Sequence, residues 1–273
     1  MPTVETNGVR TYYEERGEGQ PIVLVHGLDG NHSDWAHQLD ALSDEYRVIA
    51  YDIRGSGYTG SSDERSYSIE LFADDLHVLV DELGLDEPVV VGHSMGAKVA
   101  ITYAARYPDD LSALIFASTS HPDTDTRLLP TLLFKGLYLP LQVSTIGLLG
   151  WEAKQAVDEW VNKRVFGSTD SEVDEESLSV DVPKEMTARE FWKRNTASFD
   201  GEPGDLEVSN VTAPTLVLYG ENDAGLIVES AGDVTDEVSA PAEEDKLEDA
   251  GHDLPRHHPE TFNQAVSDFL DRV

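Results

Sequence analysis

The stretch from Val89 to Ala97 constrains the fold of this chain more than any other segment. Three consecutive valines at 89–91 are typical of the end of a buried strand, and residues 97–107 are typical of a helix. Between them lies the motif Gly-His-Ser-Met-Gly, so the strand turns into the helix within five residues. So tight a bend puts Ser94 in a strained conformation and requires small residues on both sides, as the two glycines are. The hydroxyl is then lifted clear of the sheet, beside the free N–H groups at the start of a helix.

Strands and helices alternate along most of the chain, and each is indicated by its hydrophobic period. The expected strands lie at 9–15, 22–25, 47–51, 88–91, 111–117 and 215–219, with a polar edge strand at Lys246-Leu247. The expected helices lie at 35–42, 69–83, 97–107 and 259–273. This alternation predicts an α/β fold in which helices cover both faces of a mostly parallel sheet.

The alternation stops between residues 121 and 205. No clear strand occurs there, but aromatic and aliphatic residues recur at helical spacing. We therefore predict a helical cap, or lid, at 121–205, inserted into a core formed by 1–120 and 206–273. Its leucine-rich first part, 128–151, is interrupted by a lysine, prolines and glycines, which indicates an apolar lid over a pocket and not a membrane span. The acidic, serine-rich stretch 168–181 is expected to be a solvated surface loop.

The composition narrows the partners and the compartment. The chain has 19 Lys and Arg against 53 Asp and Glu, a formal net charge of −34, and no cysteine for disulfides or metal ligands. Such a charge makes nucleic acid and anionic membranes poor partners and destabilises the folded chain in dilute buffer. Because molar salt shortens the Debye length to about 3 Å, we expect a protein that works in a salt-rich cytoplasm. The first ten residues lack an apolar run behind a basic end, so no signal peptide is expected.

Three polar residues that follow separate strands could form one catalytic group. A serine hydroxyl is a weak nucleophile at neutral pH, so Ser94 needs a base, and the base needs an acid to orient it. Asp223 comes just after the strand at 215–219, and His252 follows the last strand. Sheets of this kind build their sites at the carboxyl ends of their strands, and the chain order Ser, Asp, His is typical of them. Asp223 or His252 alone would more often be an ordinary loop residue, but the three together favour nucleophilic catalysis.

Attack on a carbonyl group also produces an oxyanion, which needs fixed hydrogen-bond donors. One expected donor is the N–H of Met95, the residue after the nucleophile, and the second is the N–H of Leu28 in the glycine-rich loop 26–30. No pair of histidines has the spacing of a zinc protease, so neither a metal nor a cofactor is expected. Histidines on polar or amphipathic segments are expected at the surface, namely His32, His37, His77, His257 and His258.

Together these motifs resemble the α/β-hydrolase fold family, specifically its soluble, capped, carboxylesterase-like serine hydrolases. The shared positions are His26-Gly27-x-x-Gly30 with Trp35, Asp52-x-Arg54-Gly55-x-Gly57, the motif at 92–96, Asp223 and His252. The resemblance covers about residues 8–118 and 208–273 and implies a sheet of about eight strands. It also implies Ser94 as nucleophile, His252 as general base and then acid, and Asp223 as its orienting acid, with the amides of Leu28 and Met95 as the oxyanion hole. Some relatives place the acid after the preceding strand, where Asp123 is the alternative.

Serine at position 94 sets the chain apart from two branches of the family it resembles, the haloalkane dehalogenases and the epoxide hydrolases, which have an aspartate at this position. Hydrolysis of a small ester-like molecule through an acyl-enzyme is therefore expected, with carboxylic esters first, and lactones or thioesters as variants. The apolar cap suggests a fairly apolar substrate group, and the protein is expected to act as a monomer or homodimer. A carbon–carbon bond hydrolase, a perhydrolase or a cofactor-free haloperoxidase could use the same residues, because fold does not choose among them. A ligand-binding protein on this scaffold is the alternative outside catalysis.

Overall fold

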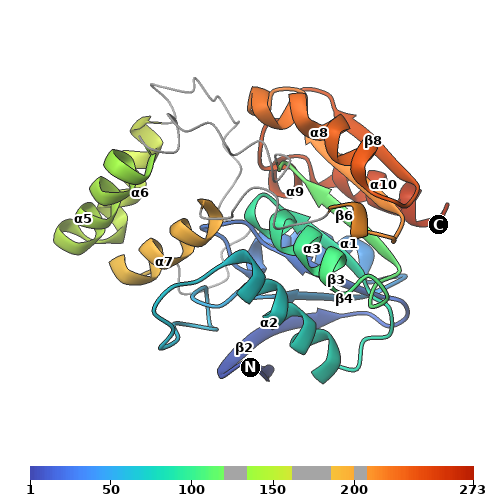
Figure 1. Ribbon diagram of the computed structural model, residues 1–273, viewed down its shortest axis with the longest axis horizontal. Coiled ribbons are helices and arrows are strands. Elements are labelled where there is room, and N and C mark those ends of the chain that lie inside the picture. The colour runs from blue at the N-terminus through green and yellow to red at the C-terminus, as the bar shows by residue number, and fades with distance from the viewer. Residues whose placement is uncertain (120–133, 162–185, 200–207) are drawn as a thin grey trace.

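The computed structural model describes residues 1–119, 134–161, 186–199 and 208–273 (Figure 1). Eight strands form one sheet in the order β1-β2-β4-β3-β5-β6-β7-β8. The first two strands pair antiparallel with their neighbours, and β3 to β8 run parallel. The strands are β1 (Thr3–Thr6), β2 (Val9–Arg16), β3 (Pro21–Val25), β4 (Arg47–Tyr51), β5 (Val89–His93), β6 (Ala113–Ala117), β7 (Thr215–Gly220) and β8 (Ala242–Leu247). The predicted α/β class with a mostly parallel sheet of about eight strands is confirmed.

Helices cover both faces of this sheet, and the strand alternation decides which residues each face contributes. Along β3, Val23 and Val25 belong to the core under α2 (Ile69–Glu82), α3 (Met95–Arg106) and α8 (Gly225–Glu237). Ile22 and Leu24 belong to the opposite core, under α1 (Ala36–Leu42) and α10 (Pro259–Leu270). Residues 22–25 are fully buried, as expected of a central parallel strand covered on both sides. The short elements η1 (His32–Trp35), η5 (Val208–Asn210) and α9 (Leu254–His257) lie in the connections.

A further group of helices lies between β6 and β7 in the chain, at one side of the layered core (Figure 1). It contains a π-helical turn η3 (Phe134–Tyr138), α5 (Leu139–Leu149), α6 (Trp151–Val161) and α7 (Ala188–Phe199). Buried side chains from all three α-helices form a small core of their own, made of Leu139, Ile146, Trp151 and Phe191. The predicted limits of the cap, the loop at 168–181 and the alternative acid Asp123 all lie outside the described residues. None of the helices described is long and apolar enough to cross a membrane.

Candidate active site

The turn between β5 and α3 has the geometry that its glycines predict. Ser94 has φ 55° and ψ −118°, in the left-handed region that a side chain rarely adopts, and its N–H donates to the carbonyl of Ala117 at 2.9 Å. A Cβ on Gly96 would collide with the carbonyl oxygens of Val25 and His26, and one on Gly92 would collide with the start of α3. The strained serine is therefore held by close packing of backbone on both sides.

The structure brings Ser94, His252 and Asp223 into one line of hydrogen bonds. His252 Nε2 lies 3.0 Å from Ser94 Oγ, and its Nδ1 lies 3.0 Å from Asp223 Oδ1. Asp223 follows β7, and His252 lies in the loop between β8 and α9. Parallel strands end at the same edge of the sheet, which brings His252 next to Ser94 although 158 positions separate them in the sequence. The distances allow the imidazole to take a proton from the serine while a carboxylate holds its other nitrogen.

The acid of this line is buried, whereas the histidine is open to solvent. The Asp223 side chain is 0% exposed and that of His252 is 46% exposed. Burial raises the pKa of Asp223, but the hydrogen bond and charge of His252, together with the Ala224 N–H at 2.7 Å, outweigh it, and the pKa ends below its ordinary value. Asp223 is therefore ionised at neutral pH and able to stabilise a positive imidazolium.

His93 also holds the histidine in place, and sequence reasoning did not identify this role. Its Nε2 donates a hydrogen bond to the backbone carbonyl of His252 at 2.8 Å, and burial together with the nearby His252 lowers the pKa of His93. A neutral His93 can keep this donor fixed without adding a second positive charge. Its place directly before the nucleophile was the available signal.

The two expected oxyanion donors belong to segments next to the nucleophile, the start of α3 and the loop after β3. Met95 is the first residue of α3, so its N–H has no acceptor within the helix. Leu28 lies in the loop after β3. The preceding Gly27 is so close to the turn between β5 and α3 that a Cβ on Gly27 would lie 3.5 Å from Ser94 Cβ. The backbone of this loop can therefore approach a substrate bound at the serine.

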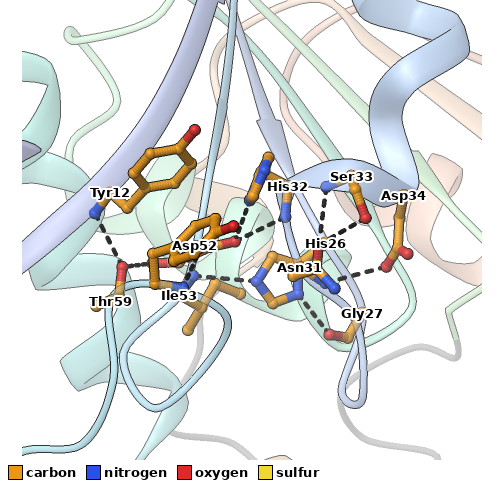
Figure 2. Close-up of polar contacts among 11 residues, drawn as sticks. Tyr12, His26, Gly27, Asn31, His32, Ser33, Asp34, Asp52, Ile53 and Thr59 are labelled. Carbon is orange, nitrogen blue, oxygen red and sulfur yellow. Dashed lines mark hydrogen bonds and ion pairs between the residues drawn. The ribbon is translucent and has the colours of Figure 1, made fainter. Parts of the chain in front are cut away.

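A buried polar network supports that loop from behind (Figure 2). The Ile53 N–H donates to His26 Nε2 at 3.0 Å, which leaves the ring proton on Nδ1 to donate to the Gly27 carbonyl at 2.7 Å. Burial, and secondly the positive charge of Arg194, lower the pKa of His26 to about 3, so this histidine is neutral. The ring is thus a fixed link between the turn after β4 and the loop after β3.

The expectation of a surface position for His32 is wrong. Its side chain is 1% exposed, and both its backbone N–H and its Nδ1 lie 2.8 Å from Asp52 Oδ1. The same carboxylate also accepts a hydrogen bond from the Tyr58 N–H at 2.7 Å. His32 is therefore buried as a hydrogen-bond partner of Asp52, which the polarity of its own segment does not predict. The four other histidines expected at the surface are partly exposed.

The described residues contain no group of three or more side chains able to hold a metal ion. What they do contain is a serine on a strand-to-helix elbow, linked through a histidine to a buried carboxylate, on a mostly parallel sheet. This combination is typical of hydrolases that carry a nucleophilic serine on a strand-to-helix turn. A family model described as alpha/beta hydrolase fold matches residues 20–255, and the chain belongs to that family.

Its relatives within the family have several activities. Epoxide hydrolase 3 of Xenopus tropicalis is 28% identical over 98% of this chain and 76% of its own length. The enol-lactonase from Burkholderia xenovorans LB400 has a structure with a TM-score of 0.79 and 25% identity, covering 99% of this chain and all of that one. Est816, described as an N-acyl homoserine lactone degrading enzyme, has a TM-score of 0.75 and 27% identity, covering 98% of this chain and all of that one. Membership of the family therefore supports a hydrolase but leaves the bond that it cleaves open.

Proposed function

We propose that this protein is a serine hydrolase that cleaves carboxylic esters, cyclic esters included, through an acyl-enzyme. The observation that carries the proposal is the pair of 3.0 Å contacts that His252 makes with Ser94 and with Asp223. In this proposal Ser94 is the nucleophile, His252 the general base and acid, and Asp223 the residue that orients and stabilises the imidazolium.

Acylation begins when His252 Nε2 removes the proton of Ser94 Oγ as this oxygen attacks the substrate carbonyl. The tetrahedral intermediate carries its negative charge on the former carbonyl oxygen, which the N–H groups of Leu28 and Met95 stabilise. His252 then gives its proton to the leaving alkoxide, the carbon–oxygen bond breaks, and an alcohol departs.

Deacylation repeats these steps with water in place of serine. The neutral His252 takes a proton from a water molecule, whose oxygen attacks the acyl carbon. The second tetrahedral intermediate collapses, Ser94 leaves with the proton from His252, and a carboxylic acid is released. In a lactone the alcohol and the acid are parts of one molecule, so the same steps open the ring.

The chemistry of the nucleophile argues for esters over the epoxides named in one relative. If Ser94 opened an epoxide, the product would be an ether, which has no carbonyl carbon for water to attack. An ester forms a serine ester, and water can release it by the route just described. The two lactone-degrading neighbours in structure support a cyclic or linear ester as the substrate.

A serine-directed fluorophosphonate separates this proposal from a ligand-binding role for the same scaffold. We expect the wild-type protein to be labelled at Ser94, and the Ser94→Ala variant to remain unlabelled and to lose about 10⁶-fold in rate. Wild-type protein that is folded but not labelled would contradict the proposal. If the protein is labelled, its rates on a panel of substrates rank the possible reactions. The panel contains nitrophenyl esters, lactones, thioesters and a ketone whose neighbouring carbon–carbon bond could be hydrolysed.

A further inference from the structure

The carbonyl of Gly27 accepts three hydrogen bonds. His26 Nδ1 donates at 2.7 Å, the Gly30 N–H at 3.3 Å, and the Arg194 guanidinium through Nη2 at 3.3 Å. The first two donors belong to the loop itself. Arg194 comes from α7, 167 residues further along the chain, in the helices inserted between β6 and β7.

Fixing this carbonyl also fixes the N–H of Leu28. The Gly27–Leu28 peptide is trans and planar, so its C=O and its N–H point in opposite directions. Three donors on one side of the peptide therefore aim the N–H out of the other side. A hydrogen bond from a charged donor also polarises the peptide and makes its N–H a stronger donor in turn.

Arg194 is unusual in being a fully buried cation that no carboxylate among the described residues binds directly. Its side chain is 0% exposed, and its Nε and Nη1 atoms are buried without a hydrogen-bond partner in the described part of the chain. Burial lowers the pKa of Arg194 to about 10, partly offset by Asp29 and Asp52 at longer range, so the side chain is charged at neutral pH. A buried charge of this kind is costly, and within the described residues its hydrogen bond is the contact with the Gly27 carbonyl.

A second contact ties the other side of Leu28 to the inserted helices. Lys154, on α6, lies 2.6 Å from the carboxylate of Asp29, the residue directly after Leu28. The Lys154 side chain is 6% exposed, so this ion pair is largely shielded from water on the lysine side. The residues before and after Leu28 are thus held by α7 and α6, respectively.

We propose that Arg194 is a positioning residue for the oxyanion hole: through the Gly27 carbonyl it orients the N–H of Leu28, so that the inserted helices complete the site. The inference rests on the proposed function, because it assigns this N–H to an oxyanion. It places Arg194 behind the peptide and not in contact with the substrate, so its loss is felt in the rate of the chemical step and not in ground-state binding.

The test compares Arg194→Met with Lys193→Met, a matched control on the same helix. Lys193 is also a buried cation, 2% exposed, but it donates to the Ser62 carbonyl and to Glu190, away from the oxyanion loop. The first readout is kcat and KM for nitrophenyl butyrate, expressed per active site titrated with fluorophosphonate. The second readout is the inhibition constant of phenylboronic acid, which forms a tetrahedral anionic adduct with a serine. Titration removes any loss due to unfolded protein.

For Arg194→Met we expect kcat to fall about 10- to 100-fold with KM within about twofold, and boronate affinity to fall in parallel, because the displaced donor acts on tetrahedral species. Lys193→Met should lower thermal stability and leave kcat within about twofold. Arg194→Lys should recover part of the loss, since it restores a buried positive charge near the same carbonyl.

Three results would overturn the inference. An increase in KM at constant kcat would make Arg194 a substrate-binding residue, and equal falls in kcat for Arg194→Met and Lys193→Met would reduce its role to packing. If Arg194→Met does not fold, Asp29→Asn decides, because this side chain is 40% exposed and its change weakens both the Lys154 contact and the longer-range attraction to Arg194. A kcat that Asp29→Asn leaves unchanged would then refute control of the loop by the inserted helices. Failure of the proposed function itself would be seen separately, as wild-type protein that no fluorophosphonate labels.

Discussion

Replacing Asp223 by asparagine should be less harmful than the usual loss of an orienting acid, because of how its hydrogen bonds are distributed. The same oxygen, Oδ1, accepts both His252 Nδ1 at 3.0 Å and the Ala224 N–H at 2.7 Å. In Asp223→Asn the amide oxygen must stay at this position, since the amide nitrogen cannot accept a bond from Ala224. The imidazole therefore keeps its proton on Nδ1 and its Nε2 free to accept from Ser94.

What this variant removes is the negative charge that stabilises the imidazolium. Two unit charges about 4 Å apart attract by about 4 kcal/mol at an effective dielectric constant of 20, which corresponds to about 10³-fold in rate. The His252 side chain is 46% exposed, so solvent screening reduces this figure. We expect kcat to fall about 10²- to 10³-fold in Asp223→Asn, and at least about tenfold further in Asp223→Ala, which also loses the orienting bond.

The assay is kcat for nitrophenyl butyrate per fluorophosphonate-titrated site, with Asp253→Asn as the matched control. Asp253 is the neighbour of His252, but its carboxylate pairs with Arg256 at 3.2 Å, so its variant should keep kcat within about twofold. If Asp223→Asn lost as much activity as Asp223→Ala, the shared oxygen would not be preserving the tautomer and the reasoning would be refuted. A loss below about tenfold would show instead that the charge of Asp223 contributes little.

Four further predictions follow from the fold and its charges. Gly96→Ala should lower the free energy of unfolding by about 1–3 kcal/mol or more in urea titrations, since its Cβ meets backbone carbonyls, whereas Gly147→Ala, in open space on α5, should raise it by about 0.5–1 kcal/mol. The pKa of His26 is about 3 in the folded chain and about 6.5 in the unfolded chain, so between these pH values only the unfolded chain binds the proton. The free energy of unfolding should therefore fall with decreasing pH by up to about 1.4 kcal/mol per pH unit. In His26→Asn this fall should be shallower between pH values of about 7 and 5. With a net charge of −34, the unfolding midpoint should rise from low to molar potassium chloride, and an unchanged midpoint would exclude adaptation to salt. Finally, kcat/KM for nitrophenyl esters should rise with acyl chain length if the site takes an apolar group, and a flat series would contradict this.

Regular patterns made the central part of the fold predictable from the sequence. The buried strands of the sheet are short apolar runs between glycine, proline and polar residues, and the motif around Ser94 has no room for another backbone geometry. Since parallel strands end at one edge, Asp223 and His252 could be expected near Ser94 before any distance was known.

Elements without an apolar signal escaped prediction. β1 reads Thr-Val-Glu-Thr and is visible only through its pairing with β2. The helix α8 begins at a glycine, and most of its second half is Glu, Asp and Thr, so its buried face is carried by few residues, among them Ile227 and Val234. In both cases tertiary contacts, and not local propensity, decide the structure.

Buried polar residues were the other gap. Nothing in the sequence near His32 or Arg194 distinguishes them from surface residues, because their burial depends on partners more than 15 residues away, Asp52 for the first and the Gly27 carbonyl for the second. Period and composition report on local neighbours only. The support behind the oxyanion loop is therefore a property of the assembled fold.

The last strand gives the acidic composition a second physical meaning. β8 is an outer strand of the sheet, and Glu243, Glu244 and Asp245 on it are all exposed. An uncovered strand border offers unpaired backbone groups to the same border of another copy, which is a common route to aggregation. Two such borders brought together would oppose rows of carboxylates, so we expect the same acidic charge that should destabilise the folded chain in dilute buffer to keep its copies apart.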